Sequence, residues 1–221
     1  MALTHNRPQE SSNSTTLAFI SNSISLSLTA LISSLIVSGD LIISKFILPQ
    51  ESYENMALLT RVSFLLAIPF VILNNNYAVE ITQRKDSWPI PKKLLINLVI
   101  STVICTTILT LSDKYLSLFS SNYDKTLTTP IIYLIVISHA MNITSSGFIP
   151  YLACHSKNYL NAALAITIPY TIIAYTHIES SKAASPELKF SLVFYSSLFF
   201  FKLTIVLFSI FNFSRSRTIS Q

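Results

Sequence analysis

The stretch SLIVSGDLIISKFIL, residues 34–48, places Asp40 inside a run whose other side chains are mostly suited to hydrocarbon. The whole chain has the same character, since 51% of its 221 residues are hydrophobic, only 11% are charged and the mean hydropathy is +0.54. A soluble domain of this length carries about 25% charged residues. The composition therefore predicts an all-α protein that crosses a membrane several times.

Six apolar runs are long enough to cross a bilayer, because a spanning helix needs about 20 largely apolar residues. No loop between them is long enough to bury a soluble core. We therefore predict a six-transmembrane-helix bundle over residues 17–213, with spans at about 17–43, 56–79, 94–112, 127–153, 159–176 and 190–213.

The basic residues predict the orientation of the bundle. With residues 1–16 as a cytoplasmic polar tail and 214–221 as a basic cytoplasmic tail, the inner segments hold eight of the 15 Lys and Arg residues and the outer loops hold five. The strongest signal is the loop QRKDSWPIPKK, residues 83–93. It predicts an interfacial anchor that meets lipid headgroups and fixes the topology through Arg84, Lys85, Trp88, Lys92 and Lys93.

Several classes of function lack the residues they need. With only two glycines the chain has no room for a phosphate-cradling loop or a dinucleotide fingerprint. Its four histidines and two cysteines show no metal-binding spacing, and the basic residues form no dense patch for nucleic acid. We therefore expect no enzyme, no cofactor, no metal and no nucleic-acid partner.

Lys202 lies near the middle of the sixth run, too far from either boundary for its side chain to reach water by snorkelling. A charge at that depth costs about 2.5–3.5 kcal/mol, so it should face protein or water. Lys202 is a candidate for attracting an anionic group in a polar cavity, which His139 and Asn142 could also line. Alternatively, Lys202 tunes helix packing as a neutral or hydrogen-bonded side chain, and the other two bond a neighbouring helix.

Asp40 lies within about one turn of the predicted outer boundary, so its depth does not match that of Lys202. Arg61, near the outer end of the next span, lies at a comparable depth. We therefore predict that Asp40 and Arg61 form a structural polar pair that holds the first helical hairpin, with a role in substrate or ion binding as the alternative.

The order of these features resembles a known family. An Asp near the end of a helix, a short loop, a Tyr and a helix that starts with Ala and Arg are typical of polysaccharide-export flippases of the multidrug/oligosaccharidyl-lipid/polysaccharide superfamily. Here these positions are Asp40, Tyr53, Ala57 and Arg61. The segment SSGFIPYLACHSKNYLNAAL, residues 145–164, is similar to a second segment of that family.

The resemblance implies one six-helix half of such a flippase, the C-terminal half, in a bacterial inner membrane. Family members move a lipid-linked oligosaccharide during the synthesis of surface polysaccharide such as lipopolysaccharide O-antigen or capsule. Because one bundle cannot enclose a transport pathway, a homodimer or a second six-helix half would be needed. A non-transporting membrane interaction subunit, or a truncated remnant of a flippase, is the alternative.

Overall fold

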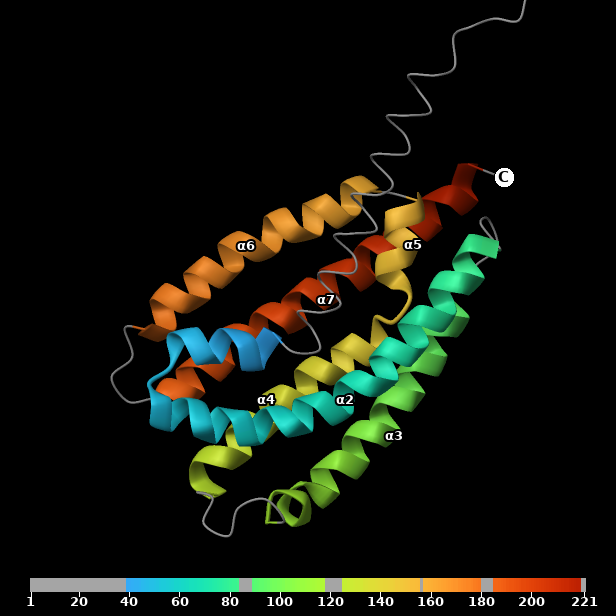
Figure 1. Ribbon diagram of the computed structural model, residues 1–221. Helices are drawn as coiled ribbons and strands as arrows, with labels where there is room; N and C mark the ends of the chain where they lie inside the picture. The colour runs from blue at the N-terminus through green and yellow to red at the C-terminus, as the bar shows by residue number, and fades with distance from the viewer. Residues whose placement is uncertain (1–38, 84–88, 118–124, 156, 180–184, 220–221) are drawn as a thin grey trace, which may run out of the picture.

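The computed structural model describes residues 39–83, 89–117, 125–155, 157–179 and 185–219, and nearly all of these residues lie in helices (Figure 1). A helix over residues 39–47 precedes six further helices. These are α2 (Gln50–Gln83), α3 (Ile90–Ser117), α4 (Lys125–Thr144), α5 (Phe148–His155), α6 (Lys157–Glu179) and α7 (Pro186–Ile219). The predicted all-α fold is confirmed.

Four of the described helices are long and apolar enough to cross a membrane, over Gln50–Ile81, Ile90–Ser112, Leu127–Thr144 and Pro186–Ser214. They coincide with the second, third, fourth and sixth predicted spans. The fifth predicted span forms α6, which does not meet this criterion of length and composition. The first lies mostly outside the described residues. The protein is thus a multi-pass membrane protein, and the six-span count stays a prediction.

The bundle buries polar side chains and exposes apolar ones. Asn97, His139, Asn142 and Lys202 are all buried, whereas large apolar side chains along the spans are exposed, as at Val103 on α3. In water this arrangement would be unstable, because burial is what normally stabilises apolar surface. In a bilayer the same surface contacts lipid, and polar groups between helices bond one another. The burial pattern therefore supports the membrane assignment.

Helices α4 and α7 occupy the centre of the bundle. The α4 helix packs against α2, α3 and α7, and α7 also packs against α6. Figure 1 shows α6 at one side of the bundle and α3 at the opposite side. Side chains that face inward from α2, α4 and α7 therefore converge in the interior.

The predicted fourth span, residues 127–153, is broken into α4 and α5 instead of forming one helix. Gly147 at the break has φ 83°, a left-handed conformation that glycine adopts without steric strain. The Asn74 side chain accepts a hydrogen bond from the Gly147 backbone N–H at 3.2 Å. Asn97 donates to the backbone carbonyls of Thr144 and Ser146 at 3.2 and 3.1 Å. Side chains from α2 and α3 thus satisfy the backbone groups that the break sets free.

Gly147→Ala is expected to destabilise the protein by about 1–2 kcal/mol, because a Cβ atom clashes in the left-handed conformation. The matched control is Gly147→Asn, since asparagine tolerates this conformation better than alanine. Thermal unfolding of the purified protein measures both. Equal melting temperatures for the Ala and Asn variants would contradict a conformational cause.

The predicted basic tail, residues 214–221, begins as helix, since α7 continues to Ile219. Its cytoplasmic location stays a prediction. The predicted tail 1–16 lies outside the described residues.

Candidate functional site

Lys202 is enclosed in the interior of the bundle. Its residue is 0% exposed, and its Nζ has no hydrogen-bond partner among the described residues. The ammonium lies 4.3 Å from the centroid of the Phe70 ring on α2, close enough for a cation–π interaction. Lys202 therefore faces protein and not lipid, and the interaction with Phe70 only partly replaces the water that it lost.

His139 and Asn142 lie on the inner face of α4, one turn apart, and both are buried. The Asn142 amide nitrogen lies 3.4 Å from His139 Nδ1, and the Ser63 hydroxyl on α2 lies 2.9 Å from His139 Nε2. His139 and Asn142 on α4 and Lys202 on α7 are all buried in the interior of the bundle, where these two helices pack against each other. His139 also bonds a neighbouring helix, as the structural alternative expected.

Asp40 is only 3% exposed and accepts a hydrogen bond from the Tyr195 hydroxyl on α7 at 2.8 Å. The backbone N–H of Leu41 donates to its other carboxylate oxygen, also at 2.8 Å. Arg61 is exposed on α2, and the described residues show no ion pair between Arg61 and Asp40. The structure thus joins Asp40 to Tyr195 where the sequence predicted a pair with Arg61.

Tyr195 connects the two groups of polar residues. Its hydroxyl lies 3.3 Å from the Ser63 hydroxyl, which in turn bonds His139. Asp40, Tyr195, Ser63, His139 and Asn142 therefore form one buried set, which we call the polar chain. It links helix 39–47 to α7, α2 and α4, so that separating any of these helices would break a buried hydrogen bond.

Several buried polar groups lack partners. Within the described part of the protein, the side-chain oxygens of Ser138, Asn142 and Ser197 and the Nζ of Lys202 are buried without a hydrogen bond. Buried polar groups in stable proteins are nearly always bonded. The Lys202 ammonium and the Asn142 side-chain oxygen are thus a buried donor and a buried acceptor that a polar ligand could use.

The predicted interfacial loop is only partly described. Arg84, Lys85 and Trp88 lie outside the described residues, and Lys92 is exposed. Lys93 forms an ion pair with Glu80 at 2.6 Å and lies 4.5 Å from the Tyr77 ring centroid. Lys93 therefore joins the ends of α2 and α3, in addition to any contact with headgroups.

Sequence reasoning missed Tyr195, Ser63 and Phe70. A signal for Tyr195 was present, because Tyr195 and Lys202 are seven residues apart and so lie on one face of α7, separated by about 10 Å along the axis. Ser63 is one serine among many, and no local pattern distinguishes it.

Neither the protein-family models, nor the curated proteins, nor the solved structures contain a match to this chain.

Proposed function

We propose that this protein moves a lipid-linked oligosaccharide across the bacterial inner membrane during the synthesis of surface polysaccharide. The proposal rests on one observation above all: the Lys202 ammonium is fully buried and has no hydrogen-bond partner in the part of the chain that the structure describes. A lone charge at this depth is unfavourable, and intramembrane charges in proteins mark substrate or ion pathways. An anionic group that arrives beside Lys202 in another conformation would supply the missing partner.

The surroundings of Lys202 suit a pyrophosphate-linked sugar. The Lys202 ammonium would contact the phosphate oxygens, while His139 and the Asn142 amide offer further hydrogen-bond donors and acceptors. No covalent step is required, so the residues bind and release the substrate without catalysing a reaction. Because α2, α4 and α7 enclose Lys202, the substrate gains access only when these helices move apart.

The same movement would break the polar chain. We propose that helix 39–47 and α7 separate when the substrate enters, with the Asp40–Tyr195 bond as the contact that holds the closed state. The second half of the pathway would come from another copy of this chain or from a partner with its own helices, as the resemblance to flippases implies.

Reconstituted full-length protein should test this function directly. Vesicles that carry a polyprenyl-pyrophosphate-linked oligosaccharide in one leaflet would be treated with a membrane-impermeant oxidant that reacts with exposed sugars. The native protein should expose the sugar to the oxidant, and Lys202→Ala should abolish this exposure. Lys114→Ala is the matched control, because Lys114 is an exposed lysine of α3.

If the native protein leaves the sugar protected, even when crosslinking shows a dimer, the transport proposal fails. The chain would then act as a non-transporting membrane subunit or a remnant.

A further inference from the structure

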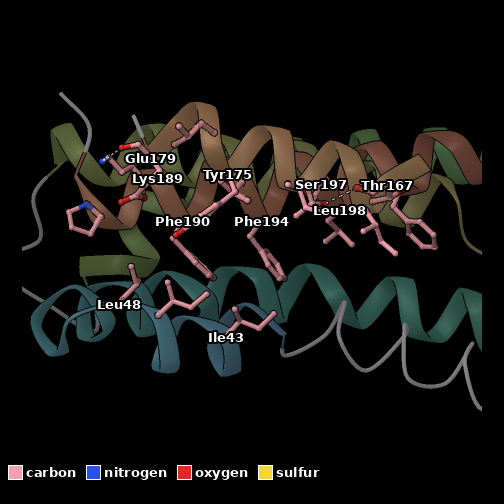
Figure 2. A pocket seen from close by; sticks show the side chains of 18 of the residues that line it. Ile43, Leu48, Thr167, Tyr175, Glu179, Lys189, Phe190, Phe194, Ser197 and Leu198 are labelled. Carbon is pink, nitrogen blue, oxygen red and sulfur yellow. Dashed lines mark hydrogen bonds between the residues drawn. The ribbon is translucent and has the colours of Figure 1, made fainter. Parts of the chain in front are cut away.

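A second feature of the molecule is an apolar groove of about 840 Å³ that helix 39–47, α6 and α7 line together (Figure 2). Ile43 contributes from helix 39–47, Ile168 and Tyr175 from α6, and Phe190 and Phe194 from α7. The volume lies within the range of about 300–1,000 Å³ that ligand pockets have. We refer to this feature as the α6–α7 groove, and it does not include Lys202 or the polar chain.

The length of the α6–α7 groove fits a hydrocarbon chain. Its lining runs from Leu164 to Glu179 on α6 and from Pro186 to Phe201 on α7. Fifteen helical residues extend about 22 Å. The hydrocarbon of one bilayer leaflet is about 15 Å thick. One lipid chain that enters at the end of the groove can therefore lie along it for the depth of a leaflet.

One end of the groove carries two opposite charges, and this decides the class of lipid. Glu179 and Lys189 both line that end, and Lys189 Nζ donates to the Glu179 backbone carbonyl at 3.3 Å (Figure 2). Among the described residues these two side chains form no ion pair with each other. Within the described ranges, the Glu179 carboxylate has no ion-pair partner, and the Lys189 ammonium keeps further N–H groups for a ligand that bears both charges.

We propose that the α6–α7 groove binds phosphatidylethanolamine. An acyl chain lies against the apolar lining, the lipid phosphate contacts Lys189, and the lipid ammonium donates hydrogen bonds to Glu179. An anionic lipid such as phosphatidylglycerol can pair its phosphate with Lys189 but has no ammonium to donate to Glu179. Phosphatidylcholine carries a quaternary ammonium that has no N–H to donate. This inference goes beyond the proposed transport function, since it applies equally to a protein that moves nothing.

Native mass spectrometry of the delipidated full-length protein tests the proposal. With phosphatidylethanolamine, phosphatidylglycerol and phosphatidylcholine offered in equal amounts, the first bound lipid should be phosphatidylethanolamine. Glu179→Gln and Lys189→Gln should each weaken its binding about fivefold, the effect of losing one exposed ionic contact. The control is Lys45→Gln, an exposed lysine of helix 39–47 that does not line the groove.

A second pair of variants tests the position of the chain. Ile168→Trp places a larger side chain in the groove and should prevent binding. Ile173→Trp on the same helix should not, because Ile173 is exposed but does not line the groove. Phosphatidylethanolamine with a photoreactive acyl chain should label α6 and α7 residues of the groove in the native protein and not in Ile168→Trp. Ile168 is itself exposed, so the substitution should leave the fold intact.

Three results would overturn the proposal. The first is equal binding of all three lipids. The second is unchanged binding by Ile168→Trp. The third is efficient disulfide formation by Ile168→Cys, in a background without Cys105 and Cys154. The second cysteine would be introduced either into residues 17–38 or into a second copy of the chain. Such a disulfide would mean that protein, and not lipid, fills the groove.

Discussion

Lys202→Met is expected to melt at a higher temperature than the native protein. Methionine retains most of the lysine volume and removes an ammonium that has no hydrogen-bond partner among the described residues. A charge at mid-membrane destabilises a protein by about 2.5–3.5 kcal/mol, and a cation–π contact offsets about 1–2 kcal/mol of this. The variant should therefore gain about 1–2 kcal/mol, or about 2–8 °C for a chain of this size.

Thermal unfolding in detergent, followed by helical circular dichroism, measures this gain. Lys114→Met, which removes an exposed lysine of α3, should leave the melting temperature unchanged. The flipping assay on the same preparation should show no activity for Lys202→Met. A residue that lowers stability and yet is required for transport fits a binding role, since functional sites often reduce stability. A lower melting temperature for Lys202→Met would mean that the ammonium stabilises the bundle.

Tyr195→Phe is expected to lower the stability by about 1.5–3 kcal/mol, the usual effect of losing a hydrogen bond to a charged group. The substitution removes only the hydroxyl, which donates to the buried Asp40 carboxylate at 2.8 Å and lies 3.3 Å from Ser63. Tyr175→Phe is the control, because Tyr175 is exposed on α6. Thermal unfolding should separate the two variants clearly.

A double-mutant cycle with Asp40→Ala identifies the partner. Once Asp40 is absent, Tyr195→Phe should have a smaller effect than in the native background, since the two groups share one interaction. A second cycle, of Asp40→Ala with Arg61→Ala, should be additive because Arg61 is exposed. Additive effects in the first cycle and strong coupling in the second would show that Asp40 pairs with Arg61, as the sequence predicted, and not with Tyr195.

The positions of four spans could be predicted from the sequence because the lipid environment acts on each residue locally. An apolar run of sufficient length must form a helix in hydrocarbon, since no water is present to bond its backbone groups. The break at Gly147 was not predicted, because its backbone groups are satisfied by Asn74 and Asn97 from other helices. Local hydropathy does not contain such contacts.

The candidate site shows the same division. Lys202, His139 and Asn142 could be selected from the sequence because charged and amide side chains are rare in apolar runs and must be buried. The partner of Asp40 could not be selected in this way. Depth along the membrane favoured Arg61, but the rotation of α2 about its axis exposes Arg61 and turns Ser63 inward.

The sequence by itself therefore determined that this protein is helical, that it lies in a membrane, and which rare polar residues must avoid lipid. Only the tertiary structure decided which of these residues meet, that Tyr195 and Ser63 join them into one chain, and that helix 39–47, α6 and α7 leave a groove with two charges at its end. The physical reason is that transfer into lipid depends on each segment alone. Hydrogen bonds and grooves between helices depend instead on the rotation and packing of several segments at once.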